Sequence, residues 1–100
     1  MSRRADLSAL VAGRLSSLAR MSYAELESLP PYSESENDSD EASVVVATWR
    51  DSVGAEGIQV VVQARRTLRL GAGVVSADGF RIERSGRRIR LTGVELSAFL

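Results

Sequence analysis

The sequence predicts an α+β domain in which N-terminal helices pack on an antiparallel β-meander of about four or five strands, with a short C-terminal helix. Three observations indicate this fold: a helical spacing of hydrophobic residues near the N-terminus, a two-residue alternation over 58–70, and closely spaced turn signals in the C-terminal third. A chain of 100 residues has the size of one domain, so we expect residues 1–100 to share a single core.

The hydrophobic residues near the N-terminus follow steps of three and four, which gathers them on one face of a helix. They are Leu7, Leu10, Val11, Leu15 and Leu18. Ser22 and Glu25 then have the spacing of a capping box, in which each side chain accepts a hydrogen bond from the backbone amide of the other residue. A second short helix is therefore expected to begin at residue 23 and to end before Pro30 and Pro31.

Residues 33–41 contain five acidic residues and no hydrophobic one. Such a segment buries no apolar surface, so we expect a flexible, solvated acidic loop between the helices and the sheet. A docking arm or a phosphorylation site is the functional alternative. The acidic residues do not match a calcium-binding loop, because the central glycine of that motif is absent. The sequence therefore predicts no metal site.

The first strand is expected to begin near residue 43. Its side chains Val45, Ala47 and Trp49 share one face, and residues 51–57, which include two glycines, are expected to form the turn that follows.

The clearest strand signal covers residues 58–70. Its even-numbered residues are hydrophobic except Arg66, and its odd-numbered residues are mostly polar. The even-numbered side chains are therefore expected to face the core. Arg66 is expected to mark a bulge, the end of the core, or an inward charge that protects a sheet edge.

Turn signals divide the remaining sequence into short strands. Residues 71–73 contain two glycines, Asp78-Gly79 is a strong signal for a two-residue hairpin loop, and Ser85-Gly86 is a weaker one. With loops at the last two sites, hydrophobic residues pair with each other, and Arg81 lies opposite Arg90. Thr92 and Glu95 form a second capping box, which predicts a short C-terminal helix that buries Leu96 and Phe99.

The composition excludes several kinds of chemistry. The chain has no Cys, no His and no Lys, so all 13 basic residues are Arg. It therefore has no disulfide or thiol nucleophile, no imidazole base or ligand, and no lysine for a Schiff base. We expect a protein that is not an enzyme and that needs no cofactor.

No hydrophobic run approaches the roughly 20 residues that span a bilayer. The run from Val44 to Ala47 is far too short, and Asp6 and Arg14 interrupt the hydrophobic core that a signal peptide would need. The expected location is the cytoplasm, without a membrane partner. The exclusive use of arginine is typical of a GC-rich bacterial coding bias, and selection for anion contacts is the alternative.

Five arginines are expected on the outward face of the sheet, where they would bind phosphate, nucleic acid or an acidic protein segment. They are Arg65, Arg69, Arg81, Arg88 and Arg90. Trp49 and Phe80 are expected on the core face, so this patch lacks aromatic residues that stack on bases, and nucleic acid is not the favoured partner. The alternatives are a solvated polar face, and docking of the acidic loop onto the arginines.

Valines occupy both faces of the first strand, since Val44 and Val46 alternate with Val45. This pattern indicates that both sides of the sheet are partly covered, one by the first helix and the other by a second subunit. The alternative is the intrinsic preference of valine for strands. The sequence thus favours a small non-enzymatic protein-interaction or self-associating domain, with a protein partner or a homo-oligomer. Anion or nucleic-acid binding by the arginine face is the alternative function.

Several segments share short motifs, including a Tyr-x-Glu-Leu-x-x-Leu-Pro stretch and an Asp-Gly-Phe sequence. They are residues 22–32, 49–50, 58–65, 77–80 and 91–96. In these motifs the chain resembles a group of small uncharacterised bacterial proteins, in which the first motif precedes a strand pair and the second forms a hairpin. The resemblance implies a bacterial protein but no activity, and no functional residue follows from it.

Overall fold

The computed structural model of the chain describes residues 7–38, 42–54, 57–68 and 73–100. The elements in chain order are α1 (Leu7–Ala19), α2 (Tyr23–Glu27), β1 (Tyr32–Asp38), β2 (Ala42–Ser52), β3 (Gly57–Leu68), β4 (Gly73–Glu83), β5 (Arg88–Arg90), α3 (Gly93–Leu96) and the 3-10 helix η1 (Ser97–Phe99).

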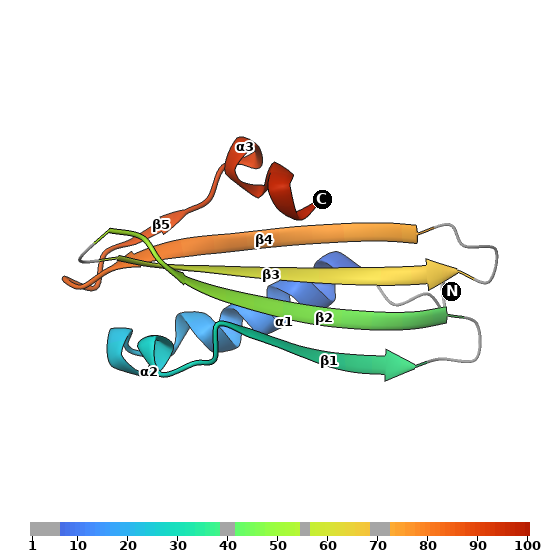
Figure 1. Cartoon of the computed structure of the whole chain (residues 1–100), viewed down its shortest axis with the longest axis horizontal. Helices are drawn as coiled ribbons and strands as arrows, with labels where there is room; N and C mark the ends of the chain where they lie inside the picture. Colours follow the sequence, from blue (N-terminus) through green and yellow to red (C-terminus); the bar gives the residue numbers. More distant parts are fainter. Residues whose placement is uncertain (1–6, 39–41, 55–56, 69–72) are drawn as a thin grey trace.

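The five strands form one antiparallel sheet, in which each strand pairs with its neighbours in the sequence. In Figure 1, α1 runs diagonally behind this sheet towards α2, and β5, α3 and η1 lie beyond β4. The side of the sheet that α1 covers is called the helix face, and the opposite side the C-terminal face. The predicted α+β fold with an antiparallel sheet is confirmed.

The core on the helix face is centred on β3. Its side chains Ile58, Val60, Val62 and Ala64 are buried and pack with those of α1, α2 and the neighbouring strands. The main partners are Leu7, Val11, Leu18, Leu26, Val44, Val46, Phe80 and Ile82. The first helix and the inward orientation of the even-numbered side chains over 58–64 are therefore confirmed. Leu70 and the side chain of Leu68 lie outside the described part of the chain.

A smaller hydrophobic cluster lies on the C-terminal face. Val61, Leu91 and Leu96 are buried there, and Trp49 and Phe99 pack against them. The prediction that Trp49 faces the same core as Phe80 is therefore wrong. The register of β2 with β3 pairs Trp49 with Val61, and a strand alternates sides, so Trp49 lies on the C-terminal face.

The acidic segment is a strand over most of its length. Residues 33–38, predicted as loop, belong to β1, which pairs with β2 along the edge of the sheet. An edge strand is held by backbone hydrogen bonds on one side and tolerates charged side chains, so the absence of hydrophobic residues does not prevent pairing. Only residues 39–41 of the predicted loop lie outside the described residues.

The hairpin predicted at Asp78-Gly79 is wrong, because β4 continues through both residues. Gly79 pairs with Val61 on β3. A Cβ atom at this position would lie 3.0 Å from Leu91 Cδ1 and closer still to the carbonyl oxygen of Val60. The glycine therefore permits a close approach of backbone and Leu91 within the sheet, rather than a turn.

The β4–β5 hairpin has a register one residue away from the predicted one. Its pairs are Phe80 with Arg90, Arg81 with Ile89, and Ile82 with Arg88. The loop contains residues 84–86, because Glu83 N–H donates to Arg87 O across it at 2.8 Å. Gly86 has a φ of +97°, the left-handed conformation that the last position of a three-residue loop requires. The prediction of a two-residue loop at 85–86 is therefore wrong.

The remaining turns are partly as expected. β2 runs to Ser52 and β3 begins at Gly57, so the turn is shorter than the predicted 51–57, and Gly54 has a φ of +70°. Residues 71–72 of the other predicted turn lie outside the described part of the chain. Arg66 pairs in unbroken register with both neighbouring strands, which excludes the bulge, and it is partly buried.

Both capping boxes are confirmed. Glu25 N–H donates to Ser22 Oγ at 3.2 Å, and Ser22 N–H donates to Glu25 Oε1 at 3.1 Å. Glu95 N–H donates to Thr92 Oγ1 at 3.3 Å, and Thr92 N–H donates to Glu95 Oε1 at 3.1 Å. Each pair satisfies amide groups that the first turn of a helix otherwise leaves free.

The close approach at Gly79 gives a prediction for stability. We expect Gly79→Ala to lower the free energy of unfolding by about 1–3 kcal/mol, because the added methyl overpacks the contact with Leu91 and β3. Gly13→Ala is the matched control, since a Cβ at this position in α1 meets no atom within 4 Å. The control is expected to raise stability by up to about 1 kcal/mol through helix propensity. Urea unfolding measures both, and equal effects would contradict the packing assigned to Gly79.

Candidate functional site

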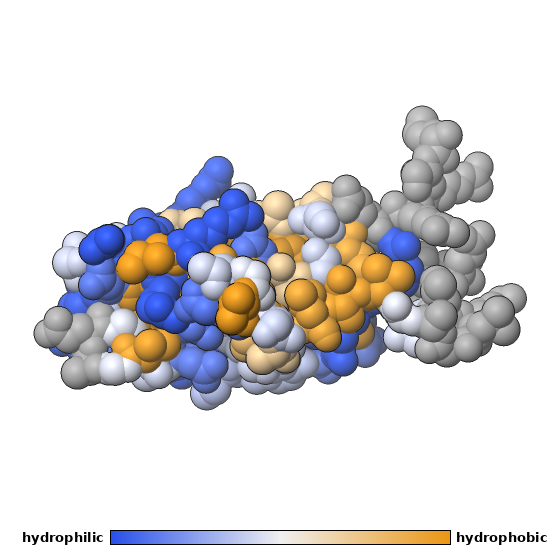
Figure 2. Space-filling view, turned by 90° about the horizontal axis from the view of Figure 1, so that it is seen from above, coloured by the Kyte–Doolittle hydropathy of each residue, from blue (hydrophilic) through white to orange (hydrophobic). Residues whose placement is uncertain are grey.

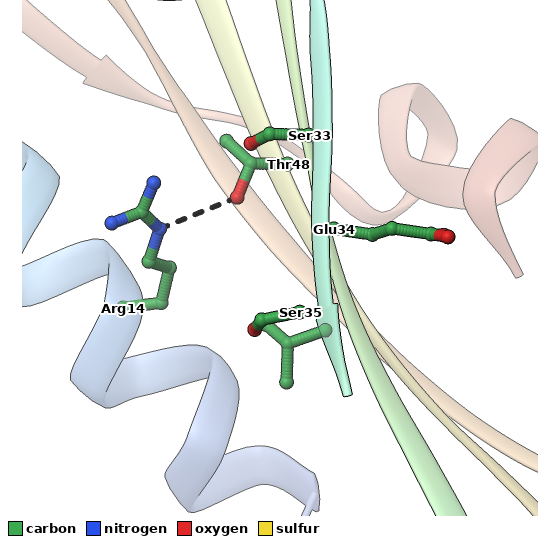
Figure 3. Close-up of a pocket in the computed structure, with 6 residues that line it drawn as sticks. Arg14, Ser33, Glu34, Ser35 and Thr48 are labelled. Atoms are coloured by element: carbon green, nitrogen blue, oxygen red, sulfur yellow. Dashed lines mark hydrogen bonds between the residues drawn. The ribbon is translucent and has the colours of Figure 1, made fainter. Parts of the chain in front are cut away.

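A cleft of about 290 Å³ opens on the helix face between α1 and the β1–β2 end of the sheet. α1 packs mainly against β3 and β4, so it leaves this end uncovered. The lining residues are Arg14, Ser33, Glu34, Ser35, Val46 and Thr48. In Figure 3, Arg14 reaches from α1 towards Thr48, and Ser33 and Ser35 are on the same side of the sheet.

The alternation of β1 separates its hydroxyl groups from its carboxylates. Ser33 and Ser35 pair with Thr48 and Val46, which places them on the helix face. The side chain of Glu34 points to the other side of the strand (Figure 3). The acidic strand therefore presents uncharged hydroxyl groups to the cleft.

The Glu34 carboxylate has partners on the C-terminal face. Tyr32 donates a hydrogen bond from its hydroxyl to Glu34 Oε2 at 2.7 Å, and an amino group of Arg65 lies 3.9 Å from the same oxygen. The hydrogen bond to Glu34 is the main cause that raises the pKa of the Tyr32 hydroxyl. Tyr32 also contacts the ring of Trp49, with 5.1 Å between centroids.

Arg14 is held at the cleft by a buried hydroxyl group. Its Nε–H donates to Thr48 Oγ1 at 3.3 Å, and Thr48 is 5% exposed. The two terminal amino groups of Arg14 have no hydrogen-bond or ion-pair partner among the described residues. The cleft thus holds a guanidinium that is oriented through one nitrogen and open at the other two.

The arginines predicted to share an outward face are divided between the two faces. Arg65 and Arg81 lie on the C-terminal face, where the amino group Nη2 of Arg81 is 2.6 Å from a Glu95 oxygen and 3.1 Å from Gln59 Oε1. The buried Nε of Arg81 has no hydrogen-bond partner among the residues that the structure describes.

The other three arginines are elsewhere. The one-residue shift in the hairpin turns Arg88 and Arg90 to the helix face. Arg88 donates to the carbonyl oxygen of Met21 at 3.0 Å, and Arg90 lies 2.6 Å from an oxygen of Asp78. Arg69 lies outside the described residues. The arrangement of Arg81 opposite Arg90 is therefore wrong, while anion binding by individual arginines stays a prediction.

The outer edge of β4 is open over residues 73–78. β5 pairs with β4 only at 80–82, and no other strand of the described chain lies along this edge. Gly79 O accepts from Leu91 N–H, and Glu83 N–H donates to Arg87, so the odd-numbered backbone groups point outward. Gly73, Val75 and Ala77 therefore each present one donor and one acceptor at this edge.

The open edge carries uncharged side chains over most of its length. Val74 and Val75 are among the exposed large hydrophobic residues of the protein. Figure 2 looks onto this edge of the sheet and shows hydrophobic surface gathered beside the grey residues at one end. The opposite edge, β1, carries Glu34 and Glu36. In the described chain, β1 is therefore protected by acidic residues, whereas residues 73–77 of β4 include no charged residue.

Other kinds of site are not found in the described ranges. No group of three or more acidic side chains is arranged there to hold a metal ion. None of the described helices has the length and hydrophobicity to cross a membrane. The chain matches no protein-family model, no curated protein and no solved structure.

Sequence reasoning missed both the cleft and the open edge. The sequence contains one feature that could have indicated the cleft. Thr48 is a polar residue that follows Val44 and Val46 on the same side of the strand. The Asp78-Gly79 turn signal predicts a break in the strand at these residues, so the sequence gives no indication of a continuous β4 edge.

The contact between Arg81 and Glu95 gives a pH prediction. The Thr92 backbone amide, and then the Arg81 side chain, hold the pKa of the Glu95 carboxyl below its ordinary value of 4.5. Between the lowered pKa of the folded state and about pH 5, the unfolded chain therefore binds more protons than the folded chain. Stability is lost as the pH falls through this range. Glu95→Gln is expected to flatten the fall of the melting temperature in this range.

The control for this experiment is Glu27→Gln, at an exposed position of α2. It is expected to keep the pH dependence of the unmodified protein. Parallel curves for Glu95→Gln and the unmodified protein would show that Glu95 does not contribute.

Proposed function

We propose that this protein is a protein-interaction domain that self-associates through the open edge of β4. The observation that supports this function is the outer edge of β4 over residues 73–78, where the outward backbone groups of Gly73, Val75 and Ala77 have no strand partner in the described chain. An exposed strand edge of this kind is a template for pairing with another strand.

The contrast between the two sheet edges favours a closed dimer. Acidic residues on β1 repel a second β1 and would be desolvated beside β4. Pairing of β4 with β4 of a second copy uses the same surface on both chains, so the assembly closes after two copies. The product would be a continuous sheet of two five-stranded halves.

A second copy on the C-terminal face, by contrast, would meet a surface that is already partly occupied. Leu91, Leu96 and Phe99 cover Val61 and Trp49 there. A second subunit on this face is therefore less favoured, because the chain's own C-terminal segment already contacts the hydrophobic residues there.

The outward backbone groups favour one register. In an antiparallel pair, two residues that lie opposite each other either both direct their backbone N–H and C=O groups towards the partner strand or both direct them away from it. If Val75 lies on the two-fold axis, it pairs with Val75 of the other copy, and Gly73 pairs with Ala77. This register uses all three outward residues of each copy, whereas moving the axis by one residue leaves outward groups unmatched.

The first test introduces a charge at the axis. Val75→Lys places two like charges opposite each other, so the dissociation constant of the dimer is expected to rise at least about tenfold. Val53→Lys is the matched control, because Val53 in the β2–β3 turn is 38% exposed and Val75 is 37% exposed. Sedimentation velocity over a concentration series measures both variants. A strict monomer for the unmodified protein at about 100 μM, or equal effects of the two variants, would refute the proposal.

The second test determines the register and uses the absence of native cysteine. A single Val75→Cys substitution is expected to give a disulfide-linked dimer under mild oxidation, because hydrogen-bonded pairs have Cα atoms about 5.5 Å apart. Val74→Cys serves as the control, since residue 74 would lie beyond disulfide distance from its copy. Faster linkage at 74 than at 75 would overturn this register and leave the self-association to be decided by sedimentation.

A further inference from the structure

The cleft at Arg14 is separate from the edge proposed for self-association. It lies at the β1–β2 end of the helix face, two strands away from β4. Self-association therefore gives no reason for its residues, and neither does the hydrophobic core, whose side chains beside it are aliphatic.

Thr48 is the residue of the cleft that packing explains least. It is buried on the same face as Val44 and Val46 and pairs with Val62. A valine has nearly the same shape and buries no hydroxyl group, which costs free energy unless it finds a partner. Here the partner of the hydroxyl is Nε of Arg14, so the polar group at position 48 serves to orient an arginine.

The charge of the cleft is set by the alternation of β1. Ser33 and Ser35 line it with hydroxyl groups, while the Glu34 carboxylate binds Tyr32 and lies near Arg65 on the opposite face. Glu34 belongs to the lining, but its side chain points away from the cleft (Figure 3). The ionised side chain directed to the cleft from the lining residues is Arg14.

We propose that this cleft binds the phosphate group of a small molecule. The terminal amino groups of Arg14 supply a paired donor for two phosphate oxygens, and the hydroxyl groups of Ser33 and Ser35 supply further donors. The volume of about 290 Å³ lies at the lower end of the range for small-molecule sites. Phosphate has more acceptor oxygens than a carboxylate and therefore fits this set of donors better.

Inorganic phosphate is the probe for the test, with the ¹⁵N-labelled chain of residues 1–100 observed by NMR. Phosphate is expected to shift the Arg14 Nε–H signal and the amide signals of Ser33, Ser35 and Thr48 in a saturable manner. Acetate at the same ionic strength is expected to bind several-fold more weakly. Binding of acetate that equals or exceeds that of phosphate would contradict the assignment to a phosphate group.

Arginine variants separate a site from general attraction between charges. Arg14→Gln is expected to weaken phosphate binding about tenfold, because it removes the charged donors. Arg20→Gln is the control, since it removes the same charge from the exposed residue that follows α1. Equal losses in the two variants, or no saturable shift in the unmodified protein, would overturn the proposal.

Thr48→Val separates binding from folding. This variant is expected to keep or raise the urea midpoint, because valine buries no hydroxyl group, and to weaken phosphate binding several-fold through the loss of orientation of Arg14. A variant that loses stability while binding phosphate as before would show that Thr48 has a structural role only. That outcome would overturn the role assigned to it here.

Discussion

The packing of α1 against the inward side of β3 is the constraint on which the rest of the structure depends. β3 has a paired strand on each side, and its side chains Ile58, Val60 and Val62 lie at the centre of the core. Burial of each such side chain stabilises the fold by about 1.5–3 kcal/mol. Because β3 is fixed in this way, the registers of β2 and β4 on either side determine which of their side chains face α1.

Both proposed sites arise because short elements cover a wider sheet incompletely. A helix is about 10 Å wide, while five strands spaced about 4.8 Å apart are roughly twice as wide. α1 over β3 and β4 therefore leaves the β1–β2 end open, and the cleft at Arg14 forms there. Similarly, β5 pairs with only part of β4, which leaves the outer backbone of residues 73–78 without a strand partner in the described chain.

Local patterns predicted some elements well and others poorly. The helical spacing of Leu7 to Leu18, the parity over 58–64 and both capping boxes were all found, since each depends on residues a few positions apart. The sequence also predicted about five strands, but for partly wrong reasons. One predicted hairpin at Asp78-Gly79 is continuous strand, and β1 formed where acidic residues had indicated a loop. The first error adds one strand and the second omits one, so the number of strands is nearly right although the topology is not.

The sequence by itself determined the helical character of α1, the starts of α2 and α3, and the buried side of the central strand, because periodicity and capping are local properties of the chain. Only the tertiary structure decided the position of Gly79 within a strand, the one-residue register of the β4–β5 hairpin, and the pairing of an acidic strand at the sheet edge. Each of these depends on backbone contacts between residues distant in sequence, and a shift of one residue moves a side chain to the opposite face. For that reason Arg81 and Arg90 lie on different faces, and Arg14 and Thr48, separated by 34 residues, meet at one cleft.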